Sequence, residues 1–329
     1  MSYGKLMALL STVVLILFIA SLWVGRDPLP ILQAAQELGS DSVWSIILTE
    51  IRLPRALIGL FAGATLGLCG AAMQGLLRNP LASPDLIGSS SGAALCAVTV
   101  LYFGLATTSA GLPILPVAGM VGALIATLFV FLLAGRDASI STLILAGVAI
   151  NTLATAGMSL LLNLAPSPYA MRELVLWTMG DLTDRSMDDF YLMLPFTLLG
   201  WGLLIGVGRQ LSTLTLGEQT AQTLGVSPSF LRWRIFLAVA FSVGATVSTT
   251  GMIGFIGLII PHLLRPLVGY DAGRLLWVSA LGGAALLLAA DIGVRLIPTE
   301  MPLKVGVLTA MVGAPFFLHL ILSARRQHL

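Results

Sequence analysis

Residues 54–76 read PRALIGLFAGATLGLCGAAMQGL and contain one charged side chain, that of Arg55. A helix needs about 20 apolar residues to cross the hydrocarbon core of a bilayer, so this run is long enough. Gly59, Gly63 and Gly67 recur at every fourth position and therefore share one helix face. Small residues at that spacing let two membrane helices approach closely. The stretch predicts a tightly packed transmembrane helix.

The rest of the chain has the same character. Of its 329 residues 57% are hydrophobic and 10% are charged, whereas soluble domains carry about a quarter charged residues. The apolar residues number roughly 188, which at about 20 residues a span is enough for nine or ten helices. We predict an all-α polytopic membrane protein forming a single domain over residues 1–329. Ten spans are expected at about 6–25, 54–76, 92–106, 113–134, 142–163, 191–208, 231–250, 254–268, 275–293 and 305–322.

The basic residues orient this topology. Ten crossings place both termini on one side of the membrane, and cytoplasmic segments are enriched in Lys and Arg. With the termini inside, ten basic residues fall on the cytoplasmic side and seven outside. We therefore predict a multi-pass protein with both termini in the cytoplasm.

The scarcity of lysine excludes an ATP site of one common kind. A phosphate-binding P-loop has the pattern G-x-x-x-x-G-K-[ST], and neither Lys5 nor Lys304 lies in that context. Any ATP that powers this chain must be hydrolysed by a separate protein. Cys69 and Cys96 lie in apolar runs among small residues, which is typical of packing residues rather than of a disulfide framework.

Three connecting segments are long enough to be more than loops. Residues 27–50 and 165–190 are expected to form short outer helices along the membrane surface. Residues 209–230 form the longest cytoplasmic segment, in which Gly225 and Pro228 end a short helix. An amphipathic helix facing the cytoplasm suits docking to a partner, and a plain surface loop is the alternative.

Two local patterns suggest catalysis, and both have simpler explanations. Residues Gly88–Gly92 match G-x-S-x-G, which in a hydrolase requires a strand-to-helix turn. No strand is predicted there, so an intramembrane serine protease using Ser90 and His262 is only a minor alternative. His262 has no further ligand residue nearby in the sequence, which favours a structural histidine over a metal site.

Charged residues near the ends of spans are the other candidates. Asp291 and Arg295 are four residues apart, so they can pair on one helix face. An unpaired Asp291 would instead favour an ion-coupled secondary transporter, because acids inside a membrane are usually functional. Arg52 and Arg55 lie where the chain re-enters the membrane from outside. They are either interfacial anchors or contacts for carboxylates of a partner protein, and Arg295 could join them.

Five stretches in order along the chain resemble one family. They are RLPR at 52–55, QGLLRNPLASPDLIG at 74–88, LGEQTAQTLG at 216–225, GFIGLIIPHLLR at 254–265 and GVLTAMVGAPFF at 306–317. Together they resemble the permease subunits of ABC importers for ferric siderophores, haem and vitamin B12. The resemblance covers about residues 50 to 322 and departs from the usual pattern at Lys304 and at Ser83-Pro84-Asp85.

This resemblance implies a type II importer permease of the bacterial inner membrane. The expected partners are a second permease, two ATPase subunits that bind ATP and Mg, and an extracytoplasmic substrate-binding protein. We expect no enzyme activity, cofactor or metal in this chain and no nucleic acid partner. The substrate would be an iron chelate, such as a siderophore or haem, or a corrinoid, and transport would proceed by alternating access.

The resemblance also assigns residues by position. Arg52, Arg55 and Arg295 match arginines that dock the binding protein, and segment 212–226 matches the helices that couple to the ATPase. The fifth and tenth spans would line the pathway, and Asn151, Thr155 and Ser159 form a polar stripe on the fifth. The alternative for this stripe is hydrogen bonding within the subunit. The residues expected in coupling are Leu216, Gly217, Glu218, Gln219, Ala221, Leu224 and Gly225.

Overall fold

The computed structural model describes residues 2–25, 30, 33, 36–37, 42–105, 114–135, 140–165, 167–299 and 302–326. These residues form helices and no strand, as predicted. The long helices are α1 (Tyr3–Trp23), α4 (Leu53–Leu76), α5 (Ser89–Tyr102), α6 (Ile114–Ala134), α7 (Ile140–Asn163), α9 (Met187–Leu204), α12 (Pro228–Thr250), α14 (Ala272–Leu296) and α15 (Val305–Arg326). The shorter ones are α3 (Val43–Ile46), α8 (Pro168–Thr178), α10 (Val207–Leu214), α11 (Glu218–Thr223) and α13 (Ile256–Leu264), with helical turns η1 (Ile47–Arg52), η2 (Pro84–Ile87) and η3 (Pro266–Val268).

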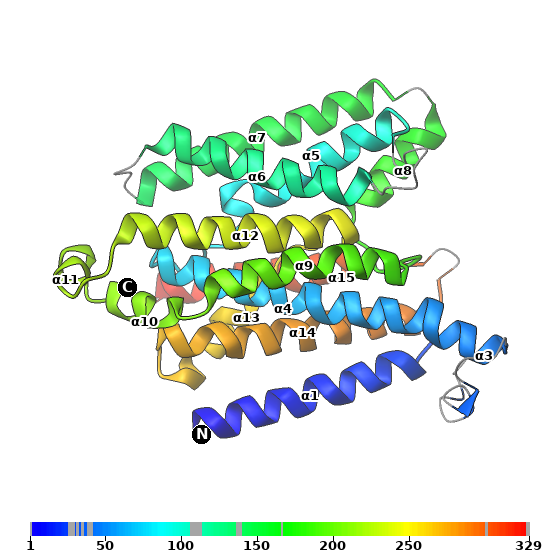
Figure 1. Cartoon of the computed structure of the whole chain (residues 1–329), viewed down its shortest axis with the longest axis horizontal. Coiled ribbons are helices and arrows are strands. Elements are labelled where there is room, and N and C mark those ends of the chain that lie inside the picture. Colours follow the sequence, from blue (N-terminus) through cyan, green and yellow to red (C-terminus); the bar gives the residue numbers. More distant parts are fainter. Residues whose placement is uncertain are drawn as a thin grey trace.

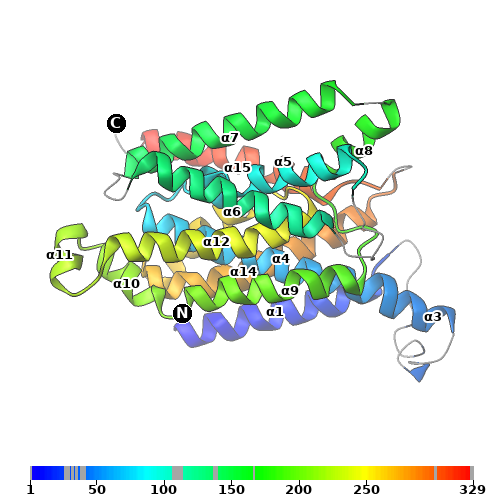
Figure 2. The ribbon, with the colours of Figure 1, turned by 45° about the horizontal axis from the view of Figure 1, so that its top comes forward.

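The long helices run roughly parallel in one bundle (Figure 1). Helices α10 and α11 and both chain ends lie at one end of the bundle, which we call the α11 end. Helices α3 and α8 lie at the other end, called the α3 end. Figure 2 shows that α1 and α7 form opposite edges of the bundle and that α4 runs between them. Both chain ends therefore lie at the same end of the bundle.

Helix α4 packs closely against α14 through glycines, as its sequence predicts. A Cβ placed on Gly63 would lie 2.4 Å from the carbonyl oxygen of Gly283, and one on Gly67 would lie 2.0 Å from that of Ser279. Such distances leave no room for a side chain, so the backbones are in direct contact. At Gly59 the nearest atom would belong to the Leu182 side chain, 3.2 Å away. The contact between the two helices therefore centres on Gly63 and Gly67.

The other sides of α4 are also covered by protein. The Trp201 indole on α9 donates to Thr65 Oγ1 at 3.1 Å and stacks on the ring of Phe61. On α12, Ser242 Oγ lies 3.3 Å from the sulfur of Cys69, which is fully buried and free, in keeping with the packing role predicted for it. Because each face of α4 meets a different helix, α4 is the centre of the fold.

The apolar runs do not all become full-length spans. Among the described residues, six helices have the length and apolar character to cross a membrane, or seven if the bent pair α9–α10 counts as one. The run at 254–268 yields α13, a helix of nine residues. At about 1.5 Å rise per residue it extends only about 14 Å, less than half of the hydrocarbon core. Phe255, with φ of +69°, precedes it and separates it from α12.

The connection before α4 differs from the surface helix expected at 27–50. Residues 26–29 and 38–41 and part of the stretch between them lie outside the described residues. From Val43 onwards the chain is helical and joins α4 through the π-helical turn η1, giving one apolar helix from Val43 to Leu76. Ser42 starts it, since its hydroxyl accepts from the Ser45 N–H at 3.2 Å. In the second connection, α8 provides the expected short helix.

Candidate functional site

A buried carboxylate organises the arginines at the α3 end. Asp291 on α14 has a side chain that is 1% exposed. Its Oδ1 accepts from Arg55 Nε at 2.9 Å and from Arg55 Nη2 at 2.8 Å. Its Oδ2 lies 2.7 Å from Arg295 Nη2. Arg55 and Arg295, predicted to lie together, are therefore held by one acid, and the pairing of Asp291 with Arg295 is confirmed.

Arg295 directs all its donors into the chain. Its Nη1 donates to the carbonyl oxygens of Ser21 at 2.8 Å and Val24 at 2.9 Å. Its Nη2 meets Ser21 Oγ at 2.6 Å as well as Asp291, and its Nε donates to the Asp291 carbonyl oxygen at 3.3 Å. A guanidinium has five N–H groups, and each one has an acceptor here. Arg295 therefore fastens the end of α1 to α14.

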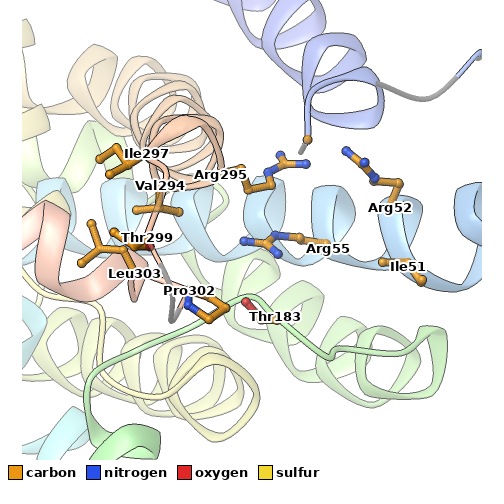
Figure 3. A pocket seen from close by; sticks show the side chains of 11 residues that line it. Ile51, Arg52, Arg55, Thr183, Val294, Arg295, Ile297, Thr299, Pro302 and Leu303 are labelled. Atoms are coloured by element: carbon orange, nitrogen blue, oxygen red, sulfur yellow. The ribbon is translucent and has the colours of Figure 1, made fainter. Parts of the chain in front are cut away.

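Arg52 lies beside this cluster. Its Nη1 donates to the carbonyl oxygen of Val24, and its guanidinium lies where any side chain on Gly25 would be. Figure 3 shows the three guanidinium groups gathered between α4, α14 and the end of α1. They line a pocket of ≈ 230 Å³. With three arginines and one paired aspartate, this pocket is positively charged and suits a carboxylate.

A second ion pair lies next to the pocket. Lys304, just before α15, contacts Asp181 through its ammonium group, and Thr183 donates to the same aspartate from its N–H at 3.1 Å and its hydroxyl at 2.9 Å. Burial by itself raises the pKa of Asp181, but Lys304 and Thr183 outweigh it and hold that pKa below its usual value. The pair anchors the beginning of α15 to the loop that follows α8. It gives Lys304, which departs from the family pattern, a structural role.

At the α11 end, the segment expected to couple to a partner folds back on the bundle. Gly217, with φ of +102°, precedes α11, and Gly225, with φ of +83°, follows it. Ala221 is completely buried, whereas Leu216 is 63% exposed and Leu224 62%. Glu218 pairs with Arg232 of α12 at 3.3 Å. The apolar residues of this segment thus divide into a buried anchor, Ala221, and two exposed leucines.

The polar stripe on α7 faces away from the bundle. Asn151, Thr155 and Ser159 are all exposed. The Thr155 hydroxyl donates to the Asn151 carbonyl oxygen at 2.8 Å, and the Ser159 hydroxyl to that of Thr155 at 2.9 Å. These two hydroxyls are satisfied by their own helix. The stripe therefore remains open on the edge of the bundle.

The residues behind the alternative functions are arranged differently from what those functions need. In the part of the chain that the structure describes, the buried Nδ1 of His262 has no hydrogen-bond partner, and no cluster of three metal-ligand side chains occurs. His262 instead meets the ring of Phe316 edge-on at 6.0 Å. Asp291 is neutralised by two arginines, which removes the basis for an ion-coupled mechanism.

Comparison with known proteins identifies the family. Residues 13–323 match the model of the FecCD transport family. The chain belongs to this family. It is 41% identical to the hemin transport system permease protein HmuU of Yersinia pestis, over 88% of this chain and 86% of that protein. It is 38% identical to the vitamin B12 import system permease protein BtuC of Shigella boydii, over 96% and 94% of the two chains.

A solved structure agrees with these relatives. A transporter assigned to the metal-chelate ABC type, in an inward-facing conformation, superposes with a TM-score of 0.84 and 32% identity. The match covers 97% of this chain and 99% of that one. The chain is thus a multi-pass permease component of an ABC importer, and it has the fold of an ABC transporter permease.

Sequence reasoning found most of the charged residues but not all their partners. The spacing of Asp291 and Arg295 indicates their pairing directly. The contacts of Arg55 with Asp291 and of Lys304 with Asp181 join residues 236 and 123 positions apart, which no local pattern reveals. The hydrogen bonds from Arg295 to Ser21 and Val24 at the end of α1 also join distant residues, so no local pattern predicts them.

Proposed function

We propose that this permease imports an iron chelate or a corrinoid, together with a second permease, two ATPase subunits and an external binding protein. The proposal is carried by the family match over residues 13–323. Three surfaces support it: the arginine pocket at the α3 end, the exposed leucines at the α11 end and the polar stripe on α7. Relatives named for haem and for vitamin B12 are 41% and 38% identical to it. Both substrates are large metal-containing macrocycles, so overall identity supports the class of substrate rather than one compound.

The α3 end is the proposed docking surface for the binding protein. Arg52, Arg55 and Arg295 give the pocket three positive charges, of which Asp291 neutralises one. Guanidinium groups bind carboxylates in a defined geometry, which suits acidic side chains on a partner. Complementary charge mainly speeds association and fixes orientation. This assignment places the α3 end outside and both chain termini in the cytoplasm.

The α11 end is the proposed contact with the ATPase, where ATP and Mg are bound. Leu216 and Leu224 present exposed apolar surface, and Phe230 near the start of α12 is also exposed, at 62%. A helix as short as α11, with six residues, is not stable alone and is held here by Ala221 and by the pair of Glu218 with Arg232. Gln219 lies on the same helix. Movement of the ATPases would therefore reach α12 through a firmly attached segment.

The exposed edge of α7 is the proposed lining of the pathway at the junction with the second permease. Lipid disfavours a stripe such as Asn151, Thr155 and Ser159, whereas a hydrated pathway accepts it. Alternating access would then reorient α7 and α15 of the two permeases relative to each other. The chain itself supplies shape and charge, and it makes or breaks no covalent bond.

Reconstitution of the complete transporter tests this function. We would assemble the permease with its ATPase and binding protein in proteoliposomes and measure uptake of haemin, a ferric siderophore and cyanocobalamin. We expect uptake of one of these, dependent on ATP inside the vesicles and on the binding protein outside. A transporter with an ATPase that cannot hydrolyse ATP is the control. Uptake that persists without ATP but stops when a proton gradient is dissipated would contradict the proposal.

A further inference from the structure

We propose that Asp291 is a positioning residue for the docking surface, and that Arg295 belongs to its support rather than to the contact with the binding protein. This inference rests on the proposed docking function. It divides the three arginines, which the family resemblance treats alike, into two groups. Arg52 and Arg55 would meet the partner, while Asp291 and Arg295 would hold them in place.

The geometry of Arg55 supports this division. Two of its nitrogens, Nε and Nη2, are bound to Asp291, and Nε lies within reach of both carboxylate oxygens at 2.9 and 3.2 Å. Side-on binding of this kind fixes the plane of a guanidinium as well as its position. In the described part of the chain no acceptor is recorded for Nη1, and Arg55 lines the pocket. Arg55 is therefore held in place by Asp291 and still has Nη1 available to bind a carboxylate of the partner.

The geometry of Arg295 leads to the opposite conclusion. Each of its five N–H groups already has an acceptor on α14 or at the end of α1. A carboxylate of the binding protein could bind Arg295 only by displacing one of them. The two side chains are similarly buried, with Arg295 10% and Arg55 14% exposed, so their hydrogen bonds and not their burial separate them. Arg295 thus contributes charge to the pocket without offering a donor to a partner.

Burial of Asp291 adds a second reason. A carboxylate that is 1% exposed is costly unless it is paired and hydrogen-bonded, and a buried ion pair seldom adds net stability over an apolar replacement. Here the carboxylate also lowers the positive charge of a surface proposed to bind acids. A residue that opposes the charge of its site is best explained by the orientation that it imposes on Arg55.

A pure charge effect and a positioning role of Asp291 predict opposite changes in docking affinity for Asp291→Asn. If only total charge matters, removing the carboxylate makes the pocket more positive and should tighten docking of an acidic partner at low salt. If Asp291 positions Arg55, the same change frees the guanidinium and should weaken docking. A charge-assisted bidentate contact accounts for about a tenfold change in affinity.

The experiment measures the dissociation constant of the purified binding protein for the assembled transporter in lipid nanodiscs, from low to high salt. We expect Asp291→Asn to raise it about tenfold at low salt. Tighter docking of Asp291→Asn would overturn the inference. Should this variant fail to assemble, Arg55→Lys serves the same purpose, because it keeps the charge but loses the fork. We expect weaker docking there too, and unchanged docking would overturn the inference.

Two further variants separate this inference from the docking function on which it rests. Arg55→Glu should abolish most of the salt-sensitive docking, and if it leaves the dissociation constant unchanged, the docking surface itself is wrong. Arg295→Gln should lower the melting temperature of the transporter and reduce the salt slope of docking less than Arg55→Gln does, because Arg295 contributes only charge whereas Arg55 also makes a direct contact. A slope reduced as much as that of Arg55→Gln would show that Arg295 contacts the partner and would overturn its assignment to the support.

Discussion

Helices α4 and α7 are equally long, with 24 residues each, yet α4 lies in the centre of the bundle and α7 at its edge. Along α4 the residues at every fourth position are glycines, and they bring it against α14. Along α7 the residues at the same spacing are Asn151, Thr155 and Ser159, and they remain exposed. Apolar composition alone therefore does not tell which membrane helix is central. In these two helices the residues at the four-residue spacing make the difference, because α4 has glycines there and α7 has polar side chains.

The largest expected effect comes from filling the contact between α4 and α14. Gly67→Ala would place a methyl group 2.0 Å from the Ser279 carbonyl oxygen, where only backbone could yield. We expect a loss of about 3 kcal/mol or more in the free energy of unfolding, measured by thermal or denaturant unfolding in detergent.

The matched control is Gly202→Ala in α9. No atom lies within 4 Å of the added methyl group, so the change should be neutral or favourable by up to about 1 kcal/mol, because alanine is the better helix former. Equal effects at the two positions would show that helix propensity, and not contact with α14, decides the role of glycine in this bundle.

A second prediction extends the comparison to the α11 end, where both kinds of surface lie side by side. Replacing the exposed Leu216 and Leu224 by serine should reduce ATP-driven uptake about tenfold while the permease keeps its melting temperature. Ala221→Leu should instead lower the melting temperature, because Ala221 is fully buried in the chain itself. Normal uptake by the double serine variant would show that this segment is a passive loop.

A third prediction tests the open side of α7. Single cysteines at Thr155 and Ser159, in a transporter whose Cys69 and Cys96 are replaced by serine or alanine, should cross-link two permeases or react with polar thiol reagents. Cysteine at Ala154, which is 5% exposed and lies about 100° round the helix from Thr155, is the control and should do neither. Reaction with lipid-soluble reagents alone would mean that this edge of the bundle faces lipid.

The smallest effect should come from the pair of Asp181 with Lys304. The pKa of Asp181 is held below its usual value in the folded chain. The pair therefore stabilises the folded state at pH above about 4, and this contribution is lost as the pH falls further and Asp181 is protonated. We expect the melting temperature of the wild type to fall by about 2–4 °C more than that of Asp181→Asn over that range. Parallel curves would show that the pair adds no stability to the beginning of α15.

Local spacing explains what the sequence could predict. The apolar runs, the glycines of α4 and the pairing of Asp291 with Arg295 all depend on residues within one helix, where periodicity is informative. The separate apolar runs at 231–250 and 254–268 predict the break between α12 and α13, but nothing in the GMIGFIG stretch around Phe255 indicates that this residue takes a left-handed conformation. The partner of Arg55 and the burial of Ala221 depend on contacts between helices, which spacing does not record.

The attachment of α1 has a consequence for how the chain is made. Helix α1 precedes the other described helices along the chain, and only 17% of its apolar window is buried in the bundle. Its strongest polar ties, from Ser21 and Val24 to Arg295, join it to a helix that is synthesised 271 to 274 residues later. Before α14 is made, α1 can contact η1, where Arg52 donates to the Val24 carbonyl oxygen, but it lacks its bonds to Arg295. Completing the attachment of α1 is therefore among the last events of biogenesis, and a chain interrupted before Arg295 keeps only the earlier contacts of this helix.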